Sequence, residues 1–252
     1  MNATLEATAR TLFKAWFVDF EPVRANLENR ASASASPEIA KLFPSEFENG
    51  LPKGWRIGNF RDCCLRVESG GTPSRAIPEF WENGTVPWLT SGEVRNPIVF
   101  DTKQYISEKG LKNSNAKLWS IGTTVIAMYG ATAGEVCLLA KEMTANQACC
   151  GLLPKQNFRS FLFLNAYLSK VEMKSKSSGS AQQNLNQSTV ANFQIILPSD
   201  DCIRMFEEKV GNFFNKWIEN EKENLKISQI RDSVLPRLIS GKIRVRQAEE
   251  ML

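Results

Sequence analysis

The N-terminal residues show a helical pattern of apolar positions. Apolar side chains recur every three or four residues, which is the spacing of one face of an α-helix. These positions are Leu5, Ala9, Leu12, Phe13 and Trp16. Pro22 then ends any regular helix. The pattern predicts an amphipathic helix over residues 3–18, with Trp16, Phe17 and Phe20 clustered at its end.

A longer helical pattern occupies the C-terminal part of the chain. Ser199 or Asp200 is a suitable N-cap, and Pro236 ends the regular pattern. Between them these positions form a heptad series: Ile203, Phe206, Val210, Phe213, Trp217, Asn220, Asn224, Ile227, Arg231, Val234 and Leu238. The series predicts one helix over residues 202–234, roughly 50 Å long at about 1.5 Å per residue.

An apolar stripe of this length needs a partner. We expect the N-terminal helix to cover one end of the stripe and to bury its aromatic cluster there. Because that helix can cover only about half of the stripe, we expect a second chain to cover the rest, and the protein to self-associate. Asn220 and Asn224 would fix the register of the pair. The alternative is a long helix that packs only on its own domain.

The middle of the chain shows short apolar runs in place of a long helical pattern. Residues 122–130, 134–140 and 193–198 are apolar runs rich in β-branched residues, and they predict strands. Residues 158–175 carry apolar side chains at helical spacing and predict a helix. Residues 31–50 are rich in Ser, Ala, Pro and Gly and predict a linker that lies over a surface.

These patterns divide the chain into four parts. They are an N-terminal helical segment (1–30), a linker (31–50), a mixed α/β domain (51–198) and a distal long-helix region (199–252). The predicted fold class is α+β, with one mixed α/β domain, a shorter N-terminal helix and a long C-terminal coiled-coil helix.

Composition excludes several classes of protein. The chain is 42% hydrophobic and 23% charged, which is typical of a globular protein, and it has no histidine. Ser-His and Cys-His hydrolases and histidine-based metal sites are therefore excluded. The six cysteines show no CxxC spacing, so we expect reduced core thiols and no metal or cofactor. No apolar run of membrane length and no signal peptide pattern is present, so we expect a cytoplasmic protein without membrane contact.

Motifs that could carry catalysis are weak. The segment "NPIVF" at 96–100 differs from a methyltransferase loop in its third and fourth positions. The segment "YGATAG" at 129–134 lacks the third Gly and the Lys-Ser/Thr of nucleotide loops. We expect Glu207 and Lys209 at exposed positions of the long helix. All three features are interpreted as structural.

Five polar loops remain on the mixed domain. They are residues 69–75, 87–95, 107–117, 144–148 and 174–187. Their Arg, Lys, Asn, Gln, Ser and Thr side chains are those that bond to phosphates and base edges. The net charge of +4 is only a weak sign of a polyanionic partner. Five such loops in one domain without a catalytic constellation favour binding over catalysis.

The order of the motifs resembles the specificity subunit of type I restriction-modification systems. The resemblance is carried by "LFKAWFVDFEPVRAN", "GGTPSR", "VPWLTSGEV", "ISEKGLKNSNAKLW", "GTTVIAMYGATAG", "TANQACCGLLP" and "IRDSVLPRLISGKIRV". It implies two target-recognition domains separated by two long-helix regions that pack antiparallel. This chain has one such domain and one distal helix region. It therefore resembles a half-length form, either naturally short or the C-terminal piece of a longer chain.

The resemblance implies recognition without catalysis or a cofactor. The implied partners are double-stranded DNA, modification (methyltransferase) subunits and restriction subunits. A half-length subunit would restore the usual architecture as a homodimer through its long helices. Such a dimer would present two identical domains to a palindromic, interrupted site.

The resemblance also places DNA contacts in the polar loops, with Arg75, Lys112 and Gln182 as the leading candidates. The candidate DNA-binding residues are Thr72, Ser74, Arg75, Thr90, Ser91, Lys109, Lys112, Asn113, Tyr129, Thr132, Lys174, Lys176, Ser178, Ser180, Gln182 and Gln183. The candidate residues for helix pairing or dimerisation are Leu12, Trp16, Phe17, Phe20, Phe206, Val210, Phe213, Trp217, Asn220, Asn224, Ile227 and Val234.

Two alternatives from other classes stay open. A standalone DNA-modifying enzyme, either a nuclease or a methyltransferase with a degenerate site, would show turnover without added partners. A coiled-coil adaptor would occupy a methyltransferase without binding DNA.

Overall fold

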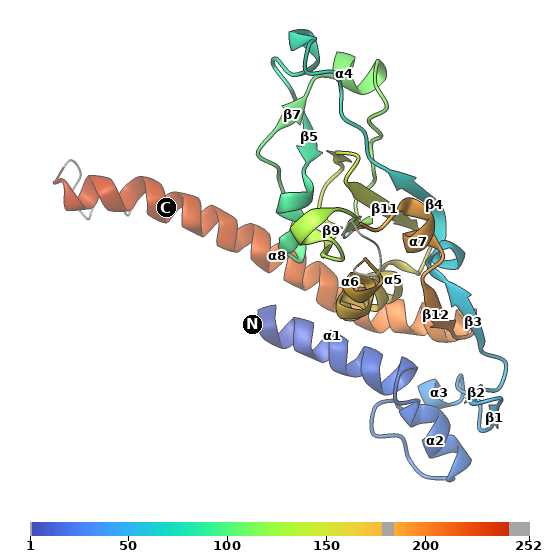
Figure 1. Cartoon of the computed structure of the whole chain (residues 1–252). Coiled ribbons are helices and arrows are strands. Elements are labelled where there is room, and N and C mark those ends of the chain that lie inside the picture. The colour runs from blue at the N-terminus through green and yellow to red at the C-terminus, as the bar shows by residue number, and fades with distance from the viewer. Residues whose placement is uncertain (1, 178–183, 242–252) are drawn as a thin grey trace.

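The computed structural model describes residues 2–177 and 184–241. Figure 1 shows a mixed α/β body above two helices that run side by side, with the C-terminal helix projecting beyond the body. We call residues 51–198 the body and helix α8 (Asp200–Ile239) the rod. In the part of the chain that the structure describes, no helix combines the length and apolar content needed to cross a membrane. The predicted α+β fold class, with an N-terminal helix and a long C-terminal helix, is confirmed.

A five-stranded sheet with the order β4-β11-β8-β9-β6 forms the centre of the body. Its strands are β4 (Cys64–Ser69), β6 (Ile98–Val99), β8 (Thr124–Ala127), β9 (Val136–Leu139) and β11 (Cys149–Pro154). Neighbouring strands are antiparallel, except that β6 and β9 are parallel. Strands β8 and β9 lie within two of the runs predicted to be strands.

A second sheet, with the order β10-β5-β7, forms a lobe at the top of Figure 1. Its strands are β5 (Val86–Leu89), β7 (Tyr105–Ile106) and β10 (Thr144–Ala145). At the other end of the body, β3 (Arg56–Asn59) pairs with β12 (Gln194–Leu197), the third predicted strand. This ladder brings the first and last parts of the body together beside the start of the rod.

Short elements connect these sheets. They are helices α4 (Glu108–Lys112) and α7 (Gln187–Ala191), the hairpin of β1 (Phe47–Glu48) and β2 (Leu51–Pro52), and the 3₁₀ turns Phe60–Cys63, Pro78–Phe80, Ser91–Arg95 and Gly130–Thr132. The helix predicted over residues 158–175 is two helices, α5 (Arg159–Leu168) and α6 (Lys170–Ser177). The single-helix prediction was wrong because the helix is interrupted at Ser169, where the predicted apolar positions Leu168 and Val171 are 38% and 82% exposed.

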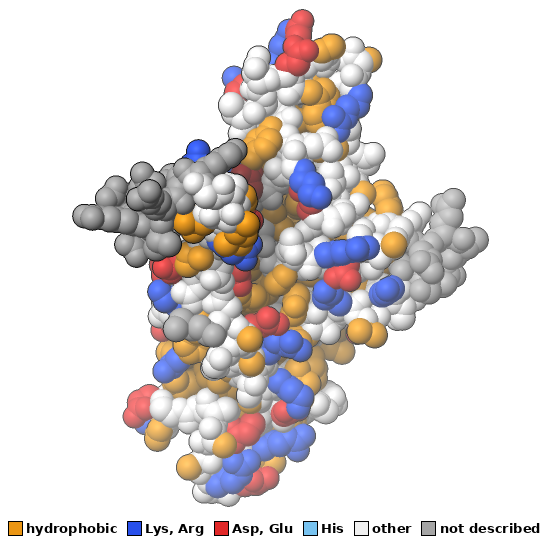
Figure 2. All heavy atoms as spheres, turned by 90° about the vertical axis from the view of Figure 1, so that its left-hand side faces the viewer, with side chains coloured by type: hydrophobic (Ala, Val, Ile, Leu, Met, Phe, Trp, Pro, Cys, Tyr) orange, Lys and Arg blue, Asp and Glu red, His pale blue; other side chains and the backbone are white. Residues whose placement is uncertain are grey.

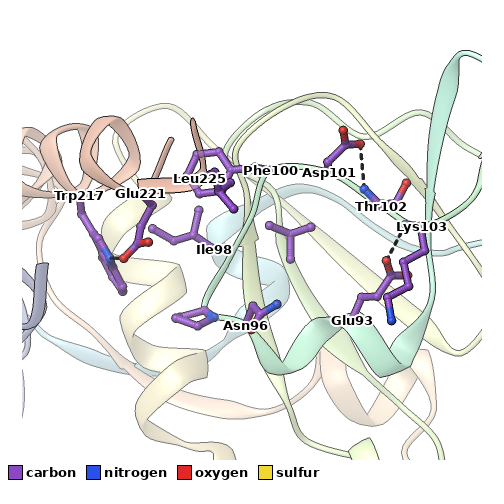
Figure 3. A pocket seen from close by; sticks show the side chains of 12 residues that line it. Glu93, Asn96, Ile98, Phe100, Asp101, Thr102, Lys103, Trp217, Glu221 and Leu225 are labelled. Atoms are coloured by element: carbon purple, nitrogen blue, oxygen red, sulfur yellow. Dashed lines mark hydrogen bonds between the residues drawn. The ribbon is translucent and has the colours of Figure 1, made fainter. Parts of the chain in front are cut away.

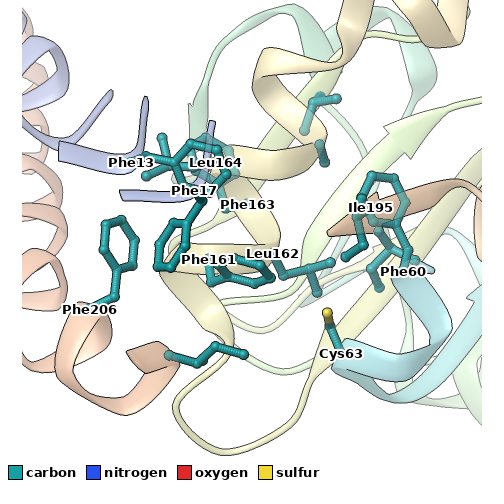
Figure 4. Packing of buried hydrophobic residues seen from close by; sticks show 14 of the residues in the cluster. Phe13, Phe17, Phe60, Cys63, Phe161, Leu162, Phe163, Leu164, Ile195 and Phe206 are labelled. Atoms are coloured by element: carbon teal, nitrogen blue, oxygen red, sulfur yellow. The ribbon is translucent and has the colours of Figure 1, made fainter. Parts of the chain in front are cut away.

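Helix α5 lies between the sheet and the rod and joins them in one apolar core. Phe161, Leu162, Phe163 and Leu164 of α5 are all buried in this core, as Figure 4 shows. The ring of Phe163 packs edge-to-face on Phe214 of the rod, with centroids 5.3 Å apart. Burial of each such side chain contributes about 1.5–3 kcal/mol, so this core determines where the body sits on the rod.

Helix α1 (Asn2–Phe17) covers the first part of the rod, as its apolar pattern predicts. The rings of Phe13, Trp16 and Phe17 lie 5.9, 5.7 and 5.0 Å from the ring of Phe206. Phe20 lies beyond the end of α1 in a left-handed conformation, with φ 54°, and packs on Trp55. The chain therefore turns at Phe20 into helix α2 (Glu21–Leu27) while its aromatic ring stays in the core.

The covered stripe of the rod keeps four of the five predicted apolar positions and differs at one. The buried apolar positions are Ile203, Phe206, Val210, Phe214 and Trp217. Phe214 is thus buried where the heptad pattern predicted Phe213, which is only partly buried. The physical reason is that a straight helix has about 3.6 residues per turn, so its buried face drifts away from a 3.5-residue repeat.

The rod also runs past its predicted end. Ser199 accepts the Cys202 N–H at 3.4 Å and caps the first turn, and the helix continues to Ile239 with Pro236 inside its last turn. The predicted end before Pro236 was wrong, because the proline lacks only its own N–H donor and the helix continues past it for one further turn. The Pro236 carbonyl still accepts the Ser240 N–H at 3.1 Å.

Polar groups mark the place where α1 stops covering the rod. The Asn220 side chain donates to Asn2 Oδ1 at 2.8 Å, and Asn2 donates to Glu221 at 2.7 Å. Trp217 Nε1 donates to the same Glu221 oxygen at 3.3 Å. The amide of Asn220 is therefore satisfied within this chain. Asn224, one turn further along, is exposed.

An ion pair joins α5 to the rod next to the apolar core. Arg159 Nε lies 3.2 Å from Glu207 Oε1, and the other Glu207 oxygen accepts the Ser160 N–H at 2.7 Å. The prediction that Glu207 is exposed was wrong, because its side chain is only 15% exposed and holds the first turn of α5. Gly211 leaves room for this pair, since a Cβ there would lie 3.1 Å from Glu207 Oε1.

The segment predicted as a linker begins with a loop that is bound to one carboxylate. Glu21 accepts hydrogen bonds from Ser32 Oγ at 2.5 Å, Ser34 Oγ at 2.7 Å, the Ala33 N–H at 3.0 Å and Arg30 at 2.9 Å. Burial alone would raise the pKa of Glu21, but these donors outweigh it and lower the pKa from 4.5 to about 2. The loop is followed by helix α3 (Pro37–Ala40), whose Ile39 and Ala40 are buried.

All six cysteines are buried and unpaired, as predicted for core thiols. Burial raises the pKa of Cys64 and Cys150 to about 12, so both remain protonated at neutral pH.

The Glu21 loop should make stability depend on pH in the acidic range. Because the folded pKa of Glu21 is depressed, its contribution is fully present above about pH 4.5 and is lost as the pH falls toward 2. We expect Glu21→Ala to lower the free energy of unfolding by about 1–3 kcal/mol at pH 7 and by less at pH 3. Urea denaturation of both proteins at the two pH values measures this. Glu46→Ala, which removes an exposed paired carboxylate, is the control with little expected effect. An equal loss at both pH values would contradict the proposed role of the Glu21 charge.

Candidate nucleic-acid interface

The polar loops form two groups on the body. Residues 70–75 lie on the upper lobe, where the turn Pro78–Phe80 also contacts α4. The turn Gly130–Thr132 lies beside α6, and Glu135 pairs there with Lys170 at 2.5 Å. The turn Ser91–Arg95 packs against Gly130–Thr132. The structure therefore brings together loops that are far apart in the sequence.

The loop of residues 70–75 is held by backbone contacts. The Gly70 N–H donates to the Cys149 carbonyl at 3.0 Å, and the Gly71 N–H donates to the Ala145 carbonyl at 2.8 Å. Thr72 and Ser74 are exposed, and the Thr72 hydroxyl bonds to Gln147. Such fixed loops present backbone and side-chain donors with little loss of conformational entropy on binding.

Helix α4 carries two of the predicted lysines, and in the described part of the chain one of them is ion-paired and the other is not. Ser107 caps the helix by accepting the Gly110 N–H at 3.0 Å. Lys109 forms an ion pair with Glu79, which lowers the pKa of that carboxyl. Lys112 is exposed, and its ammonium has no partner among the described residues. The Asn113 side chain bonds to the Lys109 carbonyl at 2.9 Å and so closes the helix end.

Two predicted hydroxyl groups serve the body itself. The Thr90 hydroxyl lies 2.7 Å from Glu93 Oε2 in a capping box that starts the turn Ser91–Arg95. Thr132 is only 8% exposed, and its hydroxyl donates to the Tyr129 carbonyl at 3.2 Å. These contacts assign both hydroxyls to turn formation, while Ser91 is partly exposed and Tyr129 is 41% exposed.

The lower group contains α6. Lys176 pairs with Glu172 at 3.0 Å and lies over the ring of Phe193, 4.3 Å from its centroid. Lys174 is on the same helix. Ser178, Ser180, Gln182 and Gln183 lie outside the described residues.

The charges of the body are mixed. Figure 2 shows Lys and Arg side chains spread over one side of the molecule and interspersed with Asp and Glu. An interface on this surface would use individual basic side chains rather than one continuous basic patch.

A groove of about 580 Å³ separates the body from the rod (Figure 3). Phe100 and Asp101 line it from the body, and Trp217, Glu221 and Leu225 line it from the rod. Its lining carries three carboxylates, Glu93, Asp101 and Glu221, against one lysine, Lys103. The excess negative charge has the same sign as a phosphate, so the groove does not fit a DNA backbone.

Sequence reasoning missed four residues that shape the upper loop. Gln104 accepts a hydrogen bond from Arg75, and Gln147 accepts one from Thr72. Trp81 and Trp88 lie beneath the guanidinium of Arg75. The two tryptophans, spaced seven residues apart after "GGTPSR", were the available signal.

The fold defines a class of protein in which a mixed α/β body with polar loops is carried on a long projecting helix. Residues 52–228 match the family described as the type I restriction modification DNA specificity domain, and the chain belongs to this family. Membership confirms the predicted resemblance. It also agrees with the prediction of a recognition subunit rather than an enzyme, because the relatives are named specificity subunits.

Two curated relatives cover nearly the whole chain. The type I restriction enzyme HindI specificity subunit of Haemophilus influenzae is 30% identical, over 96% of this chain and 62% of that protein. The MjaIX specificity subunit of Methanocaldococcus jannaschii is 27% identical, over 98% of this chain and 54% of that protein. The chain thus spans between half and two thirds of the length of these relatives.

A solved structure shares the fold. The crystal structure of the type I restriction-modification system S subunit from M. genitalium has a TM-score of 0.55 and 14% identity, covering 93% of this chain and 55% of that one.

Gly71 should be essential for the shape of the upper loop. A Cβ at this position would lie 2.3 Å from the Asn115 carbonyl oxygen, and the three nearest atoms all belong to the backbone of Asn115 and Ala116. We expect Gly71→Ala to lower the free energy of unfolding by about 1–3 kcal/mol or more, measured by urea denaturation. Gly92→Ala is the matched control, because the nearest atom to its new Cβ is 4.0 Å away. Equal effects of the two substitutions would contradict the close packing of this loop.

Proposed function

We propose that this chain is a DNA-specificity subunit of a type I restriction-modification complex, with residues 51–198 as its target-recognition domain. The observation that carries the proposal is the family match over residues 52–228, which includes the whole of the sheet, the loops and the first part of the rod. The chain would bind a half-site of double-stranded DNA and position modification and restriction subunits. It would contribute recognition and no catalytic group.

The exposed basic side chains of the upper lobe support binding to a duplex. Lys112 and Lys117 are exposed, and neither ammonium has a hydrogen-bond or ion-pair partner among the described residues. A Lys without a partner can neutralise a phosphate without first breaking an ion pair. In this proposal, paired lysines such as Lys109 contribute less.

We also propose that two copies pair through their rods. Beyond Trp217 the rod projects from the body, and it carries an apolar stripe that no described segment covers (Figure 1). The side chains that line this stripe are Ile227, Ile230, Arg231, Val234, Leu235 and Leu238. Figure 2 looks toward this end of the rod and shows apolar side chains there. A two-fold pair would place two bodies on one palindromic, interrupted site.

In this proposal the remaining segments support the rods. Of the predicted N-terminal segment (1–30), α1 covers the start of the rod, and residues 31–50 connect this segment to the body. The rod is the described part of the predicted distal region (199–252). The apolar side chains on the covered face of the rod are buried by α1 and α5 of the same chain. The pairing surface is therefore the distal stripe, with Ile227 and Val234 as its predicted members.

Removing the unpaired lysines should weaken DNA binding without changing sequence preference. For Lys112→Ala with Lys117→Ala, we expect the slope of log affinity against log salt to fall by about 0.9 for each lost phosphate contact. Fluorescence anisotropy on duplex DNA over a salt series measures the slope. Lys41→Ala with Lys209→Ala removes the same charge from exposed lysines that lie away from the upper lobe and is the control. An unchanged slope in the first variant would exclude this face as the contact surface.

Self-association should depend on the distal stripe. Light scattering should give about twice the chain mass of 28.3 kDa for the wild type and the monomer mass for Ile230→Glu with Val234→Glu, because two carboxylates would be buried in the pair. Ser233→Glu, which lies outside the stripe, should leave the dimer intact. A wild-type protein that stays monomeric at micromolar concentration would defeat the pairing proposal.

A further inference from the structure

Arg75 of the upper lobe is stacked on a pair of tryptophans. Its guanidinium carbon lies 3.3 Å from the centroid of the Trp81 ring and 5.2 Å from that of Trp88. The two rings meet edge-to-face, with centroids 5.0 Å apart and planes at 90°. Trp88 is 4% exposed and belongs to a small core with Val86. The platform beneath Arg75 is therefore fixed by the lobe itself.

The same indoles hold the loop that carries Arg75. Trp88 Nε1 donates to the Gly71 carbonyl at 3.0 Å, and Trp81 Nε1 donates to the Ser74 carbonyl at 3.1 Å. These two bonds hold the loop at two points before Arg75. The direction in which the side chain leaves the backbone is therefore determined.

The stack leaves most of the hydrogen-bonding edge of Arg75 unused. A guanidinium has five N–H donors in one plane, and an aromatic ring occupies only its face. Gln104 accepts from one terminal nitrogen. Arg75 is exposed, and no carboxylate pairs with it among the described residues. Donors thus remain available for a planar partner with two acceptors.

The fixed orientation decides which acceptor this edge fits. A flexible, fully hydrated cation such as Lys112 suffices for a phosphate, whereas a base edge must be met at a defined position and angle. The O6 and N7 atoms of guanine form a pair of acceptors that matches the arginine fork in the major groove. Preorganisation by stacking lowers the entropic cost of making both bonds.

We propose that Arg75 is a specificity-determining residue that donates two hydrogen bonds to the O6/N7 edge of a guanine in the target duplex. Trp81, Trp88 and Gln104 are positioning residues that act through Arg75. The proposal rests on the proposed DNA-specificity function and adds the identity of one recognised base.

Selection from a library of duplexes with a random central segment tests this inference. We expect the wild-type chain, with its partner subunits if they are needed, to enrich a G·C pair at one defined position. Arg75→Ala should reduce the preference at that position about 10-fold to 100-fold and leave the preferences at other positions intact. Arg75→Lys should not restore it fully, because a flexible ammonium lacks the planar fork that stacks on the two tryptophans and is held in one orientation.

Variants of the positioning residues test whether Arg75 reads a base. If Arg75 only contacted a phosphate, these variants would not change the sequence preference. Gln104→Ala alters an exposed side chain, and we expect it to relax the same position although Arg75 remains. Trp81→Ala should do so more strongly, and a thermal melt of each variant separates this effect from unfolding of the lobe. Lys112→Ala is the contrasting variant, with weaker binding to all sequences and an unchanged preference.

Three outcomes would overturn the proposal. Uniform weakening by Arg75→Ala across all sequences would make Arg75 a phosphate contact. Unchanged selection would limit it to packing within the lobe. A wild-type chain that enriches no sequence, with its partners present, would instead defeat the DNA-specificity function itself and this inference with it.

Discussion

The burial of Phe206 is the interaction on which the arrangement of this molecule depends. Its ring contacts three aromatic rings of α1, and two of those rings also contact Phe161 of α5. Edge-to-face pairs of this kind add about 0.5–1.5 kcal/mol each to the burial of the rings. Because α5 also packs on the central sheet, one cluster sets the position of the rod, the N-terminal helix and the body.

The limits of that cluster explain why the rod has two different halves. The covered half ends at Trp217, where Asn2, Asn220 and Glu221 satisfy one another. These side chains satisfy one another's hydrogen bonds at the edge of the apolar core, so the core ends there. Beyond them the rod keeps an apolar stripe, although no described part of the chain reaches it. An exposed stripe of this kind on a projecting helix is typical of a surface that binds another helix.

Fewer polar side chains of the loops are available for binding than their composition suggests. Thr90 and Thr132 use their hydroxyls to build turns, and Lys109 and Lys176 are engaged in ion pairs. Among the described residues, Lys112, Lys117 and Arg75 keep unused donors, and the direction of Arg75 is fixed by its neighbours. In the proposed function, recognition would depend on a rigid body that presents oriented groups such as Arg75.

The sequence by itself determined the elements whose pattern is local. The helical periodicity predicted α1 and most of the rod, and the β-branched runs predicted β8, β9 and β12, because these signals lie within one element. The tertiary structure alone decided that Phe214 replaces Phe213 in the core, that Glu207 binds α5, and that Trp81 and Trp88 lie beneath Arg75. The contact of Glu207 with α5 depends on which distant segments meet, and residue spacing within one segment does not encode that. The other two depend on which face of a helix the core selects and on how a loop is held, which the three-dimensional packing determines.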